Sequence, residues 1–258
     1  MDYQTITYRN SDGVATVTLN RPDVMNALNG QMRAEITHAV TEGGKSARVV
    51  VLTGAGKAFC SGQDLGDGGN AARLDLERTL RDEYVPMLKA IVDCPVPTIA
   101  AVNGPAAGAG ANLALCADVV LASDAAYFVQ AFARIGLIPD AGGTWMLPRQ
   151  VGLARAMGAS LFADRIDARK AEEWGMIYEA IPAADFEARV TERAAQLAQG
   201  PTETYRHIKE VLHASYANDL DGQLALEAKA QGACGQTRDF REGVLAFLEK
   251  RPARFEGR

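Results

Sequence analysis

The amino-acid sequence predicts an α/β fold with a largely parallel sheet, followed by a helical C-terminal part. Three strand-like segments, which begin near Val49, Thr98 and Val119, alternate with segments that carry apolar residues at helical spacing. From about Gly152 onward alanine-rich helical segments follow one another, so roughly the last hundred residues are predicted to form a helical appendage. The chain has 258 residues, of which 48% are hydrophobic. This composition suits one globular core with a helical extension.

The first elements follow from residue type and spacing. Residues 14–19 (VATVTL) alternate and predict a strand with one buried face. Apolar residues at helical spacing predict an amphipathic helix over residues 29–42. Residues 48–53 (RVVVLT) are a β-branched run, which is typical of a strand covered on both faces. Glycines follow this run and end the strand.

The later elements are predicted in the same way. Residues 74–92 predict a helix that the prolines of CPVP close. Residues 98–102 predict another buried strand, and residues 109–117 predict a helix after a glycine-rich loop. Short strands are predicted over residues 118–122 and 126–129. The helical segments beyond them are separated by Pro182, Pro201 and the pair Asn218-Asp219.

Composition excludes several classes of protein. The net charge of −5 argues against a nucleic-acid-binding protein, which typically carries an excess of positive charge. No uncharged apolar run is long enough to span a membrane. The first residues lack the basic and apolar regions of a signal peptide, so a cytoplasmic protein is expected. The four cysteines form no CxxC pair and the three histidines do not cluster with them. We therefore expect reduced thiols and no metal site.

Three familiar motifs are ruled out by individual letters. RVVVLTGAGKA superficially resembles a phosphate-binding loop, but Lys57 is followed by Ala58 rather than Ser or Thr, and the leading glycine is missing. Neither glycine-rich loop spells the GxGxxG of dinucleotide-binding folds, and no GxSxG elbow surrounds Ser61. Nucleotide hydrolysis, Rossmann redox chemistry and Ser-His-Asp catalysis therefore lose their usual support.

Three loops remain as candidates for chemistry: FCSGQD (59–64), NGPAAGAGAN (103–112) and IGLIPDAGGT (135–144). Asp140 is the only acid in the third loop, and an apolar surrounding tends to raise a carboxyl pKa until it can exchange protons near neutral pH. Backbone N–H groups of the other two loops could hold a developing negative charge. Together the loops suggest proton transfer next to a carbonyl group. Taken singly, each loop could equally be a tight turn, and Asp140 a helix N-cap.

The order of these loops carries a family resemblance that covers essentially the whole chain. The matching segments are TLNRPDVMNAL, LTGAGKAFCSGQDL, PTIAAVNGPAAGAGANLALCAD, IGLIPDAGGTWMLPRQVG, EEWGMIYEAI and REGVLAFLEKRPARF. With them the chain resembles the crotonase (enoyl-CoA hydratase/isomerase) superfamily. FCSGQDL, IPDAGGTW and EWGMI are most similar to the subgroup that isomerises ring-1,2-epoxyphenylacetyl-CoA in bacterial phenylacetate degradation.

The resemblance implies a fold and an assembly. It implies a crotonase-like spiral of ββα units over residues 1–195 and a C-terminal helical trimerisation region over residues 196–258. The family forms homotrimers or dimers of trimers, and the apolar residues 244–248 fit such an assembly. The implied substrate is an acyl-CoA thioester, in which coenzyme A is the carrier, so no separate cofactor is expected.

The resemblance also implies a site. The family's oxyanion hole falls on the backbone N–H groups of Gln63 and Ala109, the latter in place of a usual glycine, and the acid of family isomerases falls on Asp140. The residues expected to bind substrate or coenzyme A are Val24, Ala27, Ser61, Gly62, Asp64, Gly108, Asn112 and Lys250. Asn112 could instead merely start a helix, and Lys250 could belong to a solvated basic tail. Residues 66–83 are expected to line the acyl pocket.

The reaction is inferred from two acids that are absent. Family hydratases use two glutamates, at positions that carry Asn112 and Phe132 here. Water addition therefore has no obvious machinery, and the resemblance favours an isomerase that shifts a double bond or converts the epoxide ring to an oxepin. The alternatives are an enoyl-CoA hydratase that uses Asp140 alone, and a non-catalytic CoA-binding subunit.

Overall fold

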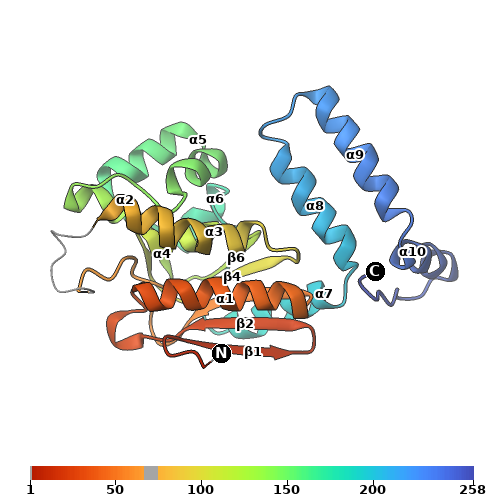
Figure 1. Ribbon diagram of the computed structural model, residues 1–258, viewed down its shortest axis with the longest axis horizontal. Coiled ribbons are helices and arrows are strands. Elements are labelled where there is room, and N and C mark those ends of the chain that lie inside the picture. Colours follow the sequence, from red (N-terminus) through yellow and green to blue (C-terminus); the bar gives the residue numbers. More distant parts are fainter. Residues whose placement is uncertain (1, 67–74) are drawn as a thin grey trace.

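The computed structural model describes residues 2–66 and 75–258 and contains a six-stranded sheet with helices on both faces (Figure 1). The strand order is β1-β2-β3-β4-β6-β9. β1 pairs antiparallel with β2, and the pairings from β2 to β9 are parallel. The bounds are β1 (Ile6–Ser11), β2 (Val14–Leu19), β3 (Val49–Gly54), β4 (Thr98–Val102), β6 (Val119–Ser123) and β9 (Glu179–Ile181).

A second, three-stranded sheet lies beside the first and carries part of the site. It contains β5 (Ala106–Ala107), β7 (Tyr127–Val129) and β8 (Ile166–Asp167), in the order β5-β7-β8. Single β-bridges join Cys60 to Ala106 and Leu28 to Gln63. The loop after β3 is thereby attached both to the second sheet and to the segment before the first helix.

The helices are set by caps and by apolar faces. Asn29 caps α1 (Gly30–Ser46), because its side-chain oxygen accepts a hydrogen bond from the Met32 N–H. α2 (Leu76–Thr79) continues through a π-helical turn, Leu80–Tyr84, into α3 (Val85–Val92). The other helical elements are η1 (Pro22–Val24), α4 (Ala109–Leu115), η4 (Ala131–Ile135), α5 (Gly143–Phe162), α6 (Ala168–Glu173), α7 (Phe186–Ala198), α8 (Thr202–Ala214), α9 (Leu220–Cys234) and α10 (Arg238–Glu249).

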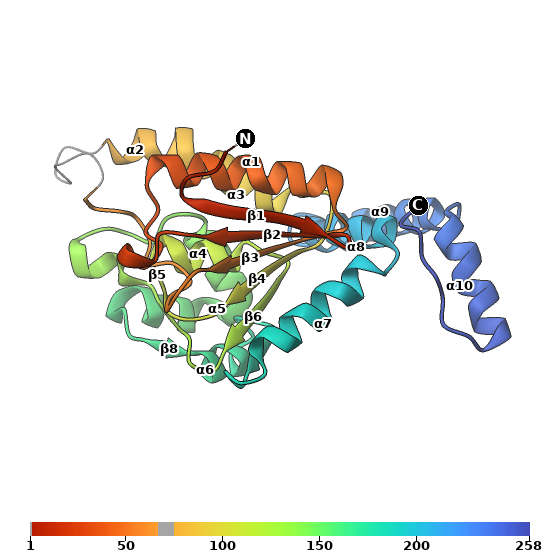
Figure 2. The ribbon, with the colours of Figure 1, turned by 90° about the horizontal axis from the view of Figure 1, so that it is seen from below.

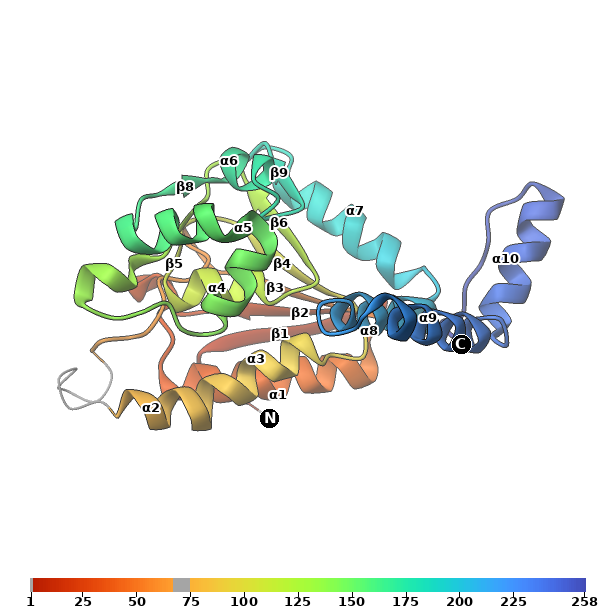
Figure 3. The same cartoon turned by 90° about the horizontal axis from the view of Figure 1, so that it is seen from above.

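The two faces of the main sheet bury alternate side chains. Val50 and Leu52 of β3 join the larger core, to which α1, α3 and α4 contribute. Val49 and Val51 join a smaller core with Phe186 of α7. Figure 3 shows α1 and α3 on one side of the sheet and α7 on the other, and Figure 2 shows the same layers from the opposite direction. This two-sided burial explains why β3 is an almost unbroken apolar run.

The elements predicted for the first half are largely confirmed. The strands over residues 14–19 and 98–102 are found with those bounds, and the helix predicted over residues 29–42 extends to Ser46. The helix predicted over 74–92 is described from Leu76, since residues 67–74 lie outside the described residues, and it contains the π turn. β1 was not predicted from the sequence.

The prediction of a purely helical C-terminal hundred residues is wrong in its first part. β8 and β9 lie in this stretch, and β9 is the edge strand of the main sheet. Strands of two and three residues are too short to show an alternating pattern among alanine-rich helices. The helical character also begins earlier than residue 152, since α5 starts at Gly143 and is kinked at Gly152, where φ is 78°.

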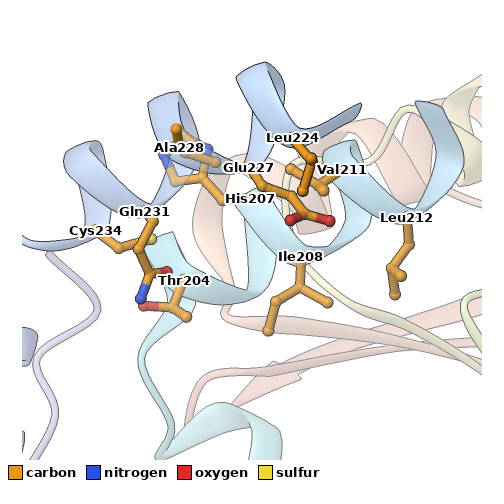
Figure 4. A pocket seen from close by; sticks show the side chains of 11 residues that line it. Thr204, His207, Ile208, Val211, Leu212, Leu224, Glu227, Ala228, Gln231 and Cys234 are labelled. Carbon is orange, nitrogen blue, oxygen red and sulfur yellow. The ribbon is translucent and has the colours of Figure 1, made fainter. Parts of the chain in front are cut away.

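α8, α9 and α10 extend away from the sheet (Figure 1). A salt bridge of 2.8 Å between Lys209 and Asp118 ties α8 to the start of β6. A groove of about 570 Å³ lies between α8 and α9, lined mostly by apolar side chains together with His207 and Glu227 (Figure 4). Among the described residues, no helix is long and apolar enough to cross a bilayer. The domain boundary between residues 195 and 196 stays a prediction.

Candidate active site

The three loops singled out in the sequence meet around one cavity of about 270 Å³. Its walls are mainly apolar and come from the loop after β3, the α2–α3 segment, the start of α4 and the η4 region. The larger apolar side chains are Leu65, Leu76, Leu80, Phe132, Ile135 and Leu137. The polar side chains are Ser61, Gln63, Thr79, Tyr84, Arg134 and Asp140. Of the expected acyl-pocket residues 66–83, Leu76, Thr79 and Leu80 line this cavity, and residues 67–74 are outside the described part.

Backbone hydrogen bonds hold the first loop against the segment before α1. The Leu28 N–H donates to the Gly62 carbonyl at 2.8 Å, and the Asp64 N–H donates to the Leu28 carbonyl at 3.1 Å. The Ser61 N–H donates to the Met25 carbonyl at 2.9 Å. The loop that follows β3 is therefore paired with this segment through its backbone, as in a parallel strand pair.

The first and second loops touch through their backbones, which explains two of their glycines. Gly62 has φ of +94°, and a Cβ there would lie 2.8 Å from the Ala107 carbonyl oxygen and 3.4 Å from the Ala109 nitrogen. A Cβ on Gly110 would overlap Cys60. Only glycine permits this approach at both positions. The close packing brings Gln63 and Ala109 to the same wall of the cavity.

The backbone amides of Gln63 and Ala109 are available as donors to a ligand. Leu28 bonds to the residues on either side of Gln63, so the Gln63 N–H points away from Leu28. Ala109 is the first residue of α4, where an N–H has no partner inside the helix. In the described part of the chain, neither amide donates a hydrogen bond to another protein group.

Asp140 carries the carboxylate of the cavity. Its main-chain carbonyl accepts hydrogen bonds from Asn112 Nδ2 at 2.7 Å and from the Gly143 N–H at 2.8 Å, which fixes the turn. Its Oδ1 is buried and has no hydrogen-bond partner among the described residues. Burial raises the pKa of Asp140 from 3.8 to about 6. Asp140 is not the N-cap of α5, because that position belongs to Gly142.

The two positions where a hydratase would carry acids have different surroundings here. Phe132 lines the cavity with its ring. Asn112 is fully buried and does not line the cavity, and its Oδ1 accepts a hydrogen bond from Gln130 at 2.8 Å. Of the described residues that line the cavity, Asp140 is the only carboxylate.

The residues expected to bind coenzyme A divide into two groups. Ser61 Oγ donates to the Val24 carbonyl at 3.2 Å, and Arg21 Nη1 donates to the Ala27 carbonyl at 2.6 Å and to Asp64 Oδ2 at 2.8 Å. Ser61 and the glycines at 62 and 108 also line the cavity. By contrast, Lys250 is exposed and follows α10, which lies at the far end of the chain from α4 (Figure 1). In a single chain, the structure does not bring Lys250 to the site.

Sequence reasoning missed a polar cluster behind the first loop. The side-chain oxygen of Gln63 accepts hydrogen bonds from Arg33 Nη1 at 2.9 Å and from Tyr84 Oη at 2.7 Å. Arg33 is buried although it sits on α1 beside the core residues Met32 and Ile36. The sequence does carry one signal of this cluster, an arginine among the apolar residues of a predicted helix. A charged side chain that is buried there needs hydrogen-bond partners.

The polar groups of this cavity are suited to proton transfer next to a carbonyl group. Two amide N–H groups can bind a carbonyl oxygen as it gains negative charge, and one carboxyl group with a raised pKa can take up and return a proton. The apolar walls suit a hydrophobic acyl group. Over residues 2–66 and 75–258, no three His, Cys, Asp or Glu side chains converge as a metal ion would require.

Comparison with known proteins gives consistent matches along the chain. The family described as "Enoyl-CoA hydratase/isomerase" matches residues 9–258. A "probable enoyl-CoA hydratase" of Rhodobacter capsulatus is 60% identical over 258 residues, which cover 100% of both chains. The "1,2-epoxyphenylacetyl-CoA isomerase" of Escherichia coli is 43% identical, covering 95% of this chain and 96% of that protein. A crystal structure of an enoyl-CoA hydratase from Bacillus anthracis has a TM-score of 0.91 at 32% identity, covering 99% of this chain and 100% of that chain.

Proposed function

The chain belongs to the enoyl-CoA hydratase/isomerase family, and we propose that within this family it is an isomerase of acyl-CoA thioesters. One observation carries the proposal: Asp140 is the only carboxylate among the described residues of the cavity. Proton transfer along an acyl chain needs one group that takes and returns a proton. The addition of water by the two-acid route needs a second such group.

In the proposed reaction, the thioester carbonyl oxygen accepts hydrogen bonds from the Gln63 and Ala109 N–H groups. Asp140 removes a proton from the acyl chain, and the charge moves to the carbonyl oxygen as an enolate forms. The two amides bind this oxygen more strongly as its charge grows, so they lower the barrier as well as bind substrate. Asp140 then returns the proton at a different carbon, which shifts the double bond.

The E. coli relative suggests a specific substrate. We propose that the same pocket isomerises 1,2-epoxyphenylacetyl-CoA to the oxepin. The Gln63 and Ala109 N–H groups and Asp140 would stabilise the charge that develops on the substrate while the ring opens and expands. The apolar side chains of Leu80, Phe132 and Leu137 offer a surface on which an aromatic ring can pack. On this proposal, the protein would act in phenylacetate catabolism.

Hydration of enoyl-CoA is the second candidate. It is favoured by the 60% identical relative from R. capsulatus, which carries the name of a hydratase. The site opposes it, because Phe132 occupies the cavity wall where a second acid would be needed, and Asn112 is held behind Asp140. A hydratase of this chain would have to use Asp140 for both proton transfers.

We further propose how substrate and subunits are bound. Val24, Ala27, Ser61, Gly62, Asp64 and Gly108 would hold coenzyme A near the oxyanion loop, while Asn112 would act on substrate through Asp140. Homotrimers, or dimers of trimers, would cover the apolar side chains of the last helices, such as Leu212 (61% exposed) and Phe247 (83% exposed). Lys250 would then reach a coenzyme A bound by a neighbouring subunit. The cytoplasmic location expected from the sequence stays part of this proposal.

The experiment is Asp140→Asn, assayed for conversion of trans-3-hexenoyl-CoA to the conjugated 2-enoyl thioester. We expect kcat to fall by about 10²–10⁴-fold, which is the usual worth of a positioned acid–base group. Acyl-CoA binding, measured by calorimetry, should be nearly unchanged. The control is Asp93→Asn, which alters an exposed carboxylate paired with Lys89 and should keep full activity. Retained turnover in Asp140→Asn would overturn the assignment.

A further inference from the structure

A largely buried polar cluster lies directly behind the proposed oxyanion loop, and its side chains have no role in the chemistry above. It consists of Arg33 from α1, Gln63 from the loop, and Glu83 and Tyr84 from the π turn. Single π turns inserted in α-helices occur frequently at functional sites. Here the π turn supplies two consecutive residues to the cluster, so its position relative to Gln63 is fixed by the fold.

Arg33 contacts both partners of the β-bridge that orients the loop. Its Nη1 donates to the Leu28 carbonyl at 2.8 Å and to Gln63 Oε1 at 2.9 Å. Its Nε and Nη2 donate to Glu83 Oε2 at 3.0 and 2.6 Å. The Arg33 side chain is 4% exposed and that of Glu83 is 41% exposed, so the cation is the buried member of the pair. The planar guanidinium holds five N–H donors in a fixed fork, whereas a lysine ammonium has three donors at a single point on a flexible stem.

Tyr84 completes the contacts of the Gln63 side chain. Its Oη donates to Gln63 Oε1 at 2.7 Å, and its ring lies 4.8 Å from the Arg33 guanidinium carbon. A carbonyl oxygen has two lone pairs, and Gln63 Oε1 uses both on these donors. Rotation of the Gln63 side chain would therefore leave buried donors unpaired, which is unfavourable. Tyr84 also lines the cavity that contains Asp140.

We propose that Arg33 and Tyr84 are positioning residues that hold the Gln63 main-chain N–H at the oxyanion. This inference rests on the proposed function, because it assumes that this N–H binds the thioester oxygen. The bridge to Leu28 sets the direction of the N–H, and the side-chain clamp keeps the same residue from shifting as charge develops. Preorganised donors stabilise a transition state because they need no rearrangement when the reaction occurs.

The kinetic test uses Tyr84→Phe and Arg33→Lys. Each variant loosens the clamp but retains Gln63 and its main-chain N–H group. We therefore expect kcat for 3-hexenoyl-CoA to fall about 10-fold, below the 10²–10³-fold typical for complete loss of an oxyanion donor. KM should stay within about twofold of the wild-type value if substrate binding is unaffected. The control is Tyr8→Phe, which removes a buried hydroxyl without a partner among the described residues and should leave kcat unchanged.

A spectroscopic test separates positioning from a merely structural role. Phenylacetyl-CoA labelled with carbon-13 at the thioester carbonyl serves as the probe, and isotope-edited infrared spectra report its stretching frequency when bound. Hydrogen bonds from the two amides should lower this frequency in the wild-type protein. The lowering should be smaller in Tyr84→Phe and Arg33→Lys and unchanged in Tyr8→Phe.

The outcomes distinguish the two levels of the proposal. A wild-type carbonyl frequency equal to that of free phenylacetyl-CoA would overturn the oxyanion role itself, and the positioning role with it. A lowered wild-type frequency that both variants retain in full, with wild-type kcat, would overturn only the positioning role. If Arg33→Lys does not fold, Tyr84→Phe alone decides, since it loses only one hydroxyl.

Discussion

Replacement of Asp140 by Asn should stabilise the protein while it removes activity. The carboxylate is buried, its Oδ1 has no partner among the described residues, and its pKa is raised from 3.8 to about 6 by burial. The ionised form is therefore less stable in the folded chain than in the unfolded chain. Asparagine has nearly the same shape but cannot ionise, so it avoids this cost. The proposed catalytic carboxylate would thus lower the stability of the folded chain.

The sign and size follow from proton linkage. Below about pH 3.8 Asp140 is protonated in both the folded and the unfolded chain, and its ionisation costs no stability. As the pH rises the unfolded chain ionises first, so stability falls until the folded carboxyl ionises near pH 6. The difference between a pKa of 3.8 and one of about 6 would lower the free energy of unfolding by about 3 kcal/mol, at about 1.36 kcal/mol for each pKa unit. Because water reaches part of the side chain and screens its charge, we expect Asp140→Asn to raise the free energy of unfolding by about 1–2 kcal/mol at high pH.

The assay is thermal unfolding of wild type and Asp140→Asn at equal protein concentration, at pH 5 and at pH 8. At pH 8 the variant should melt about 3–6 °C higher, given about 2–4 °C for each kcal/mol in a chain of this size. At pH 5 about half of the gain should remain, because the unfolded carboxyl is already ionised. Asp93→Asn should show no such gain. A variant less stable than wild type at pH 8, or a gain that is equal at both pH values, would refute the reasoning.

Two further predictions follow from the contacts of Asp140. The ratio kcat/KM should rise with pH and level off above about pH 7, because the carboxyl must be ionised to take a proton and its pKa is about 6; a flat profile between pH 5 and 8 would contradict this role. Asn112→Ala removes the hydrogen bond to the Asp140 carbonyl and leaves Gln130 without a partner, so we expect about 1–3 kcal/mol less stability in urea unfolding and a kcat lowered about 10-fold. Wild-type kcat in that variant would show that the hydrogen bond to Asp140 does not matter for catalysis.

Much of the fold could be predicted because its strands are buried on both faces. β3 and β4 consist mainly of small and branched residues; the predicted bounds match those of β4, and those predicted for β3 are shifted by one residue. β8 and β9 could not be predicted, since two or three residues show no period, and their place depends on partners far along the chain. The π turn at residues 80–84 likewise has the residue spacing of an ordinary helix in the sequence.

The site was predictable to the extent that it lies in glycine-rich loops. Gly62 and Gly110 permit backbone contact, and that requirement is visible as glycine in the sequence. The part that could not be predicted depends on burial. Nothing in the sequence indicates that the Asn112 amide donates to the Asp140 carbonyl, and the position of Arg33 on α1 indicates a need for partners without identifying Gln63 as one of them. Both contacts join residues about thirty positions apart.

The most direct measurement is the identity of the product that the wild-type protein forms from trans-3-hexenoyl-CoA and from crotonyl-CoA, read from the ultraviolet absorbance of the conjugated thioester together with the product mass. With Asp140 as the only carboxylate among the described residues of the cavity, we expect the first substrate to give a 2-enoyl thioester of unchanged mass. We expect crotonyl-CoA to remain largely unconverted. Fast conversion of crotonyl-CoA to a product heavier by one water molecule, with little isomerisation of the first substrate, would show that the protein is a hydratase instead.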